Sequence, residues 1–197
     1  MARGGLLPLL LAALLLAACG GDADEESGSR DRGDTDEAEE TEAMLPPRRT
    51  EDLDMAVEQA GCELRSFAPE GNEHVDGRVG YRSNPPHSGD HNPIPADDGP
   101  YGEAPPTEML VHSLEHGRVI VQFDPDAPDA LEDTLEQLYE EDPYHLILTP
   151  NATDMPFEVA ATAWTKVLGC PDAGEATYDA IRAFSQEFRD TAPERVP

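Results

Sequence analysis

Proline and glycine are concentrated in residues 84–106, which hold seven prolines and three glycines. Proline fixes its own φ angle and lacks an amide donor, so a segment of this composition forms neither a helix nor a central strand. The sequence therefore predicts a long irregular loop within the folded region. A loop of this length inside a small domain is either functional or disordered. Its two histidines, His87 and His91, together with Tyr101, favour a functional loop.

The rest of residues 50–192 contains helical and strand patterns. Apolar residues repeat at helical spacing between Thr50, a residue suited to the N-cap, and Gly61, then after Asp126 or Pro128, and again over residues 175–189. Short β-branched or apolar runs predict strands at residues 119–123, 146–148 and 157–164. Few strands, interspersed helices and some hairpin-length connections predict a small single α+β domain, with a mostly antiparallel sheet flanked by helices.

The N-terminus has the pattern of a bacterial lipoprotein precursor. Arg3 precedes an apolar run over residues 6–18, which is shorter than the ~20 residues that span a bilayer as a helix. The run ends in Leu-Ala-Ala-Cys-Gly, which resembles a lipobox, so we expect residues 1–19 to be a signal peptide whose Cys19 takes a lipid. Acyl chains such as palmitate would hold the protein on the outer face of the cell membrane, in an extracytoplasmic compartment. Ordinary cleavage beside an unmodified cysteine is the alternative.

Residues 20–49 are dominated by acidic side chains and contain no aromatic residue. Such a segment buries too little apolar surface to offset its ordering entropy, so we expect a disordered acidic tether, with a cation-binding role as the alternative. The whole chain has 42 acidic and 13 basic side chains and a net charge of −29. That charge argues against nucleic acid as a partner, because phosphate would be repelled. The sequence indicates the membrane as a partner, bound through the lipid on Cys19. It points to no particular protein partner.

The chain has three cysteines. If a lipid modifies Cys19, then Cys62 and Cys170 remain. Two thiols in one small domain usually pair in an oxidising compartment, and this bridge would tie the start of the domain to its last third. The other interpretation, a pair of soft metal ligands, lacks the short CxxC spacing of cysteine metal sites.

Five of the six histidines fall within 43 residues: His74, His87, His91, His112 and His116. The neutral imidazole nitrogen suits zinc, copper, nickel and iron, and three or four rings from separate segments can complete a coordination sphere. The last two histidines are four residues apart, which puts both rings on one face if residues 107–115 form a helix. If residues 110–112 instead form a strand, the pair can still converge through the turn that follows.

The segment from His112 to His116 also matches the inverted zincin pattern H-x-x-E-H, in which the glutamate is the general base for a zinc-bound water. A five-residue pattern is weak support by itself, and Gly117 with the strand after it would cut such a helix short. Three interpretations stay open: a non-catalytic metal site, a zinc hydrolase with Glu115 as its base, and a hydrogen-bonded histidine cluster without metal.

Four segments carry a resemblance to a known family. The chain reads NPPHSGDHNP at residues 84–93, LVHSLEHG at 110–117, ILTP at 147–150 and ATAW at 161–164. In this order, over about residues 55–190, they resemble the family catalogued as domain of unknown function 3105, whose members are bacterial membrane-anchored or lipoprotein chains without an assigned activity. The resemblance implies that the family's histidines fall on His91, His112 and His116, and that an upstream one falls on His74. His87 stands where the family tends to have threonine, and His145 lies outside the motifs.

These observations predict a copper or zinc site formed by His74, His91, His112 and His116, with Glu115 accepting an imidazole N–H. Copper is slightly favoured, because imidazole sites rank high in affinity for Cu(II). The alternatives are the zinc hydrolase and a metal-free module whose proline-rich loop, Tyr101 and Trp164 bind a peptide or glycan.

Overall fold

The computed structural model describes residues 44–194 and residue 196; the predicted signal peptide, Cys19 and the tether up to residue 43 lie outside the described residues. The helices are α1 (Leu53–Ala60), α2 (Thr107–Glu115), α3 (Asp129–Glu141) and α4 (Glu175–Phe188). The strands are β1 (Glu63–Ser66), β2 (Gly99–Pro100), β3 (Val119–Phe123), β4 (Leu146–Pro150), β5 (Val159–Ala163) and β6 (Lys166–Cys170). Over the described part of the chain, every helix is too short or too polar to cross a bilayer.

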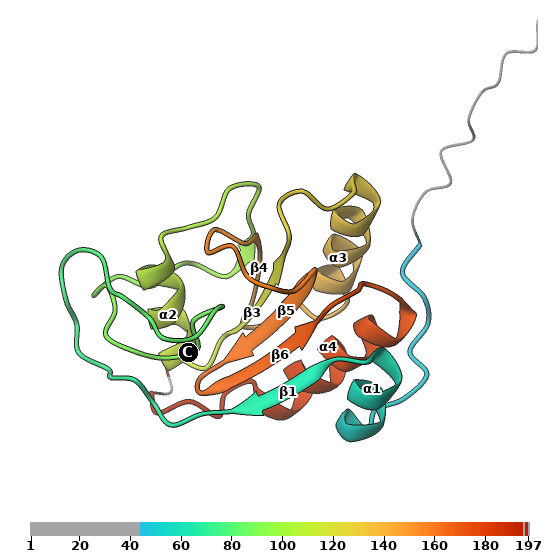
Figure 1. The fold of residues 1–197 in the computed structure, drawn as a ribbon, viewed down its shortest axis with the longest axis horizontal. Helices are drawn as coiled ribbons and strands as arrows, with labels where there is room; N and C mark the ends of the chain where they lie inside the picture. Colours follow the sequence, from blue (N-terminus) through green and yellow to red (C-terminus); the bar gives the residue numbers. More distant parts are fainter. Residues whose placement is uncertain (1–43, 195, 197) are drawn as a thin grey trace, which may run out of the picture. The chain divides into compact units, whose positions relative to one another are not determined.

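The six strands form one sheet in the order β1-β6-β5-β3-β4-β2. Strand β3 runs parallel to β4, and α3 connects the two; β3, β5, β6 and β1 are antiparallel neighbours. All five residues of β3 are buried, as expected for a strand in the middle of a sheet. The protein is therefore the small α+β domain with a mostly antiparallel sheet that the sequence predicts (Figure 1).

The two faces of the sheet bury different helices. Along β3, Val119, Val121 and Phe123 pack in a large apolar core with residues of α1, α3 and α4. Ile120 points to the opposite face, where it packs with Leu110 and Leu114 of α2 in a smaller core. This division follows from the alternation of side chains along a strand. It places α2, which carries His112 and Glu115, on the face opposite to α4.

Some element boundaries differ from those predicted. Asp52, not Thr50, caps α1, because its carboxylate accepts the N–H of Met55 (2.8 Å). The strand expected over residues 157–164 is shorter and covers β5, since Thr165 adopts a positive φ of 63° in the turn that begins β6. The sequence patterns do not predict β1, β2 or β6: β1 is a polar edge strand, β2 has only two residues within the proline-rich loop, and β6 carries Lys166 and Gly169. None of these strands has the continuous β-branched pattern on which sequence prediction depends.

The segment that leads into α1 lies against α3 and α4. The Leu45 N–H donates to the Gln137 side chain of α3 (3.0 Å), and the Arg49 N–H donates to Asp179 of α4 (3.0 Å). Arg182 of α4 in turn donates to the Pro46 carbonyl (3.1 Å). These bonds fix the path of residues 45–49 along the helical face of the sheet.

Cys62 and Cys170 form the predicted disulfide, which joins the residue after α1 to the end of β6. It therefore leaves neither thiol free to bind a metal. The bridge spans 108 residues of sequence, and in the chain-entropy description a closed loop of that size stabilises the fold by roughly 4–5 kcal/mol.

Candidate functional site

Three segments bring imidazole and carboxylate groups together on the α2 side of the sheet. His74 and His91 come from the irregular chain between β1 and α2, and His112 and Glu115 come from α2. One ligand atom from each residue lies within 4.8 Å of the others, and all except His74 are buried. We refer to these four residues as the histidine group.

Helix α2 covers residues 107–115, so the helical alternative for this segment is the one that forms. His112 and Glu115 are three residues apart and therefore share a face of the helix. His116 follows as the C-cap residue, one turn after His112. The three- and four-residue spacing of His112, Glu115 and His116 is the sequence pattern that indicates this shared helical face.

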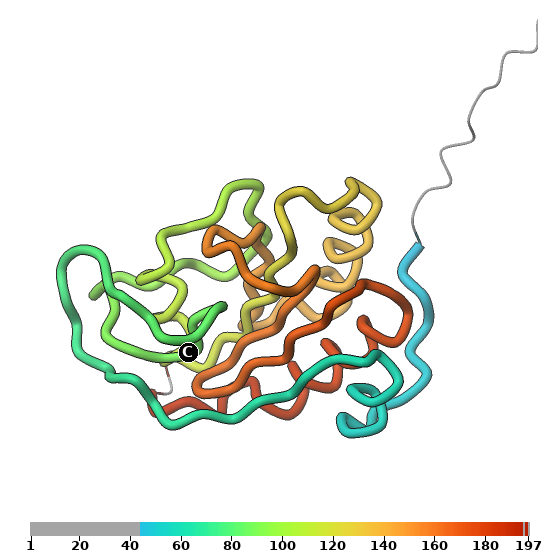
Figure 2. The backbone as a smooth tube through the Cα atoms, in the orientation of Figure 1, coloured from blue at the N-terminus to red at the C-terminus, as the bar shows by residue number. Residues whose placement is uncertain are grey.

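The irregular chain is fixed beside α2 by backbone bonds, and Figure 2 shows its path in green. His74 and His91 form an isolated parallel bridge, in which the His91 N–H donates to Glu73 (3.0 Å) and its carbonyl accepts the Val75 N–H (2.8 Å). The Asn92 N–H donates to the Glu108 carbonyl of α2 (3.2 Å). The loop of residues 84–106 therefore presents His91 from an ordered position.

Hydrogen bonds to carbonyl groups fix the protonation of two rings. His91 Nδ1 lies 2.8 Å from the Gly89 carbonyl, and His112 Nδ1 lies 2.6 Å from the Asn92 carbonyl. A carbonyl only accepts, so both Nδ1 atoms carry the proton, and in a neutral ring Nε2 then has a free lone pair. This is the usual arrangement of a metal-binding histidine, whose other nitrogen is held by a backbone carbonyl or a carboxylate.

The Nε2 atom of His91 is buried and has no hydrogen-bond partner among the described residues. It lies 3.0 Å from Oε2 of Glu115. A lone pair and a carboxylate oxygen at this distance repel each other unless a proton or a cation lies between them. Either a shared proton or a metal ion therefore accounts for this contact.

Burial sets the charge state of the site. It lowers the pKa of His112 to about 4, an effect that the neighbouring His116 and His91 increase, so this ring is neutral near pH 7. Burial also raises the pKa of the Glu115 carboxyl, which His91 and a hydrogen bond from Asn72 partly offset. A neutral imidazole is the form that binds a metal, and a buried carboxylate gains most from a nearby positive ion.

His116 lies beside the histidine group and not within it. Its Nε2 is 2.9 Å from Nε2 of His112 and 3.5 Å from Oε2 of Glu194. Burial lowers the pKa of the His116 ring. The structure thus gathers His74, His91 and His112 of the predicted ligands, while Glu115, expected only to orient a ring, places its own carboxylate among the ligand atoms. In the inverted zincin pattern the roles would be the other way round, with His116 as a zinc ligand and Glu115 as the general base.

The two remaining histidines lie elsewhere. His87 is buried against Phe67, with ring centroids 4.4 Å apart, and its Nδ1 pairs with the Ser88 hydroxyl (2.8 Å). His145 pairs through Nδ1 with Asp190 (2.7 Å). Neither ring joins the histidine group.

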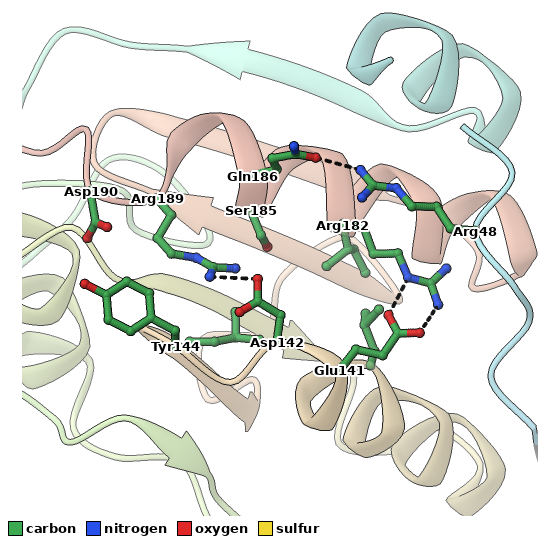
Figure 3. A pocket seen from close by; sticks show the side chains of 12 residues that line it. Arg48, Glu141, Asp142, Tyr144, Arg182, Ser185, Gln186, Arg189 and Asp190 are labelled. Carbon is green, nitrogen blue, oxygen red and sulfur yellow. Dashed lines mark hydrogen bonds and ion pairs between the residues drawn. The ribbon is translucent and has the colours of Figure 1, made fainter. Parts of the chain in front are cut away.

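A cavity of about 690 Å³ lies away from the histidine group, between α3, α4 and β4 (Figure 3). Arg48, Arg182 and Arg189 line it, but each guanidinium is already bound by the protein. Arg182 pairs with Glu141 (2.7 Å), Arg189 with Asp142 (2.8 Å), and Arg48 donates to Gln186 (2.9 Å). These contacts assign the arginines a structural role.

Comparison with known proteins gives a family but no function. No curated protein matches the chain, and no solved structure matches it either. The family described as "Protein of unknown function (DUF3105)" matches residues 74–196, a range that contains the histidine group, His116 and Glu194. Because this match covers well over half of the 197 residues, the chain belongs to the DUF3105 family.

Proposed function

We propose that the protein binds one divalent transition-metal ion, copper or zinc, at the histidine group. The observation that carries the proposal is the buried, unbonded Nε2 of His91, held 3.0 Å from the Glu115 carboxylate. A buried polar atom without a partner is uncommon in native proteins, and a bound ion is one of the explanations for it.

The dimensions of the group suit a single ion. Ligand nitrogens that each lie ~2.0–2.1 Å from one zinc ion are themselves roughly 3–4 Å apart. The four ligand atoms lie within 4.8 Å of one another, so the most distant of them need to approach by roughly 1–2 Å to share an ion. His74 is the exposed member of the group, so its ring has more room to move than the three buried side chains.

The donor set suits copper and zinc. Three imidazoles with one carboxylate resemble the nitrogen-rich sites that these ions occupy in proteins. The single buried carboxylate, Glu115, offsets part of the charge of a divalent ion. In return the ion neutralises Glu115, which forms no ion pair with a lysine or arginine among the described residues. At equal geometry, Cu(II) binds more tightly than Zn(II), so copper is the ion of higher affinity.

The proposed setting is the outer face of a cell membrane. The lipobox-like sequence at Cys19 supports a lipid anchor, and the acidic segment after it supports a solvated spacer between lipid and domain. The net charge of −29 supports a role among cations and not among polyanions.

Metal analysis of the untagged protein tests the binding proposal. We expect one equivalent of copper or zinc after dialysis, and its loss in both His91→Ala and His112→Ala. His87→Gln is the matched control, because His87 is also buried and also has an unbonded Nε2, but lies outside the group. Retention of metal by His91→Ala, or the absence of metal from the wild-type protein under titration with both ions, would refute the proposal and leave a proton-sharing cluster.

A further inference from the structure

The C-terminal residues run beside the end of α2. The Asp190 N–H donates to the Gly117 carbonyl (3.0 Å), and the Glu194 N–H donates to the Glu115 carbonyl (3.2 Å). Arg118 donates to the Val196 carbonyl (3.1 Å). These bonds hold the Glu194 side chain next to His116, at a point where the carboxylate is 55% exposed.

His116 and Glu194 thus form an outer pair of potential ligands that adjoins the histidine group. The carboxylate oxygen and the ring nitrogen are 3.5 Å apart, and the same nitrogen is 2.9 Å from Nε2 of His112. Two nitrogens bound to one zinc ion at ~2.0–2.1 Å lie roughly 3 Å apart, so this spacing also fits a shared ion.

We propose that the metal ion is first captured by His116 and Glu194, together with His112, and then passes to the histidine group. This inference rests on the proposed function, and it assigns to His116 and Glu194 the role of an outer position on the path of the ion. His112 belongs to both positions and acts as the ligand that is kept during the transfer.

The chemistry of His112 makes the two positions mutually exclusive. Its Nδ1 donates to Asn92, so the ring has one free lone pair, at Nε2. One lone pair binds one ion, and we therefore expect a single ion per chain, at either position. Transfer breaks the bonds to His116 and Glu194 and forms bonds to His74, His91 and Glu115, with no change in oxidation state; the proton that His91 and Glu115 share in the metal-free protein is released to solvent.

An ion that binds at the outer position must displace the proton that lies between the rings of His112 and His116. Because Nε2 of His112 is the acceptor, His116 donates the proton in the 2.9 Å contact. When an ion binds there, this proton moves to Nδ1 of His116, and the ring stays neutral. The exposed carboxylate of Glu194 meanwhile attracts the approaching cation.

An ion could instead reach the group directly past His74, which is also exposed. The two routes can be separated by kinetics, because Trp164, the only tryptophan of the chain, lies 6.4 Å from His91 between ring centroids. A bound Cu(II) ion quenches nearby indole fluorescence. Because His112 belongs to both positions, the quenching of Trp164 reports the arrival of Cu(II) at either of them.

Stopped-flow mixing of the full-length mature protein with Cu(II) tests the inference. We expect quenching to become roughly ten-fold slower in His116→Asn and in Glu194→Gln, a change within the usual range for association rates of related variants. The two variants should reach the wild-type final quench. Glu140→Gln on α3 removes one exposed carboxylate without contact with either position, and should leave the rate unchanged.

The outcomes separate this inference from the proposed function. An unchanged rate in both variants would show that the ion arrives past His74, and would overturn the inference while metal binding stands. Loss of the final quench in His116→Asn would make His116 a permanent ligand, and would also overturn it. No quenching or metal uptake in the wild-type protein would instead refute the proposed function.

Discussion

Nε2 of His91 lies 3.0 Å from Oε2 of Glu115, although the two residues come from an irregular loop and a helix and both are buried. The Nδ1 proton of His91 is already donated to Gly89, so this contact requires a second proton or a cation between the two atoms.

Glu115→Gln should make the metal-free protein more stable and the metal-bound protein less so. Burial raises the pKa of Glu115, so the ionised carboxylate destabilises the fold at neutral pH, and a neutral amide removes that cost. The same change removes an anionic ligand. Thermal unfolding with a chelator and with added zinc measures both effects; a higher metal-free Tm together with a smaller zinc-induced rise is expected. A lower metal-free Tm would contradict this account.

Gly89→Ala should disturb the site through the backbone. Gly89 has a φ of 132°, and a Cβ there would lie 2.8 Å from the Tyr81 ring. Its carbonyl also holds the Nδ1 proton of His91, so a shift of this residue turns the ring away from Glu115. We expect metal affinity to fall roughly 10–100-fold, as when a supporting contact of a ligand is lost, measured by competition with a chelating dye. Gly80→Ala is the control, since open space surrounds Gly80.

The buried histidines should make the metal-free fold sensitive to acid. Burial lowers the pKa of His87 below its ordinary value of 6.5, so the unfolded chain binds this proton first as pH falls. The neutral ring therefore contributes stability above pH 6.5, which is lost as pH decreases towards the lowered pKa. Urea unfolding from pH 7.5 to 5 should show wild type losing stability relative to His87→Gln. If the free energies of unfolding of wild type and His87→Gln differ by a constant amount across this range, the lowered pKa of His87 is refuted.

Arg182→Leu should destabilise the protein strongly, independently of any metal. Arg182 pairs with Asp179 at 3.0 Å, and their side chains are only 8% and 2% exposed. Removing the arginine leaves a buried carboxylate without its main partner, at a cost of about 3–5 kcal/mol in the free energy of unfolding. Urea denaturation measures it. Arg65→Leu, which breaks an exposed pair with Glu63, should change stability by less than about 1 kcal/mol.

The sequence predicted the fold class because its strongest local patterns belong to the centre of the domain. Val119–Phe123 is a β-branched run that becomes the buried middle strand, and the apolar repeat after Glu175 becomes α4. The polar edge strand β1 and the glycine-containing β6 carry weak patterns, and pairing with neighbouring strands determines their structure. Local patterns do not record such pairing.

The part of the histidine group that depends on residue spacing along α2 could be predicted from the sequence. His112 and Glu115 share a face of α2 because they are three residues apart, and their meeting with His91 follows from the bonds that tie Asn92 and Ala96 to the same helix. The position of Glu194 beside His116 was not predictable, since 78 residues of sequence separate them and ordinary backbone bonds bring the C-terminal residues to α2. Contacts of this kind leave no repeat or motif in the sequence.

The bonds of Leu45 and Arg49 to α3 and α4 have a mechanical consequence. They fasten the incoming chain to the helices on one side of the sheet, while α2 and the loop that carries His91 lie on the other side. A pull on the N-terminal end therefore acts first on α3 and α4. The side chains of the histidine group lie on the other face of the sheet, away from these anchoring bonds.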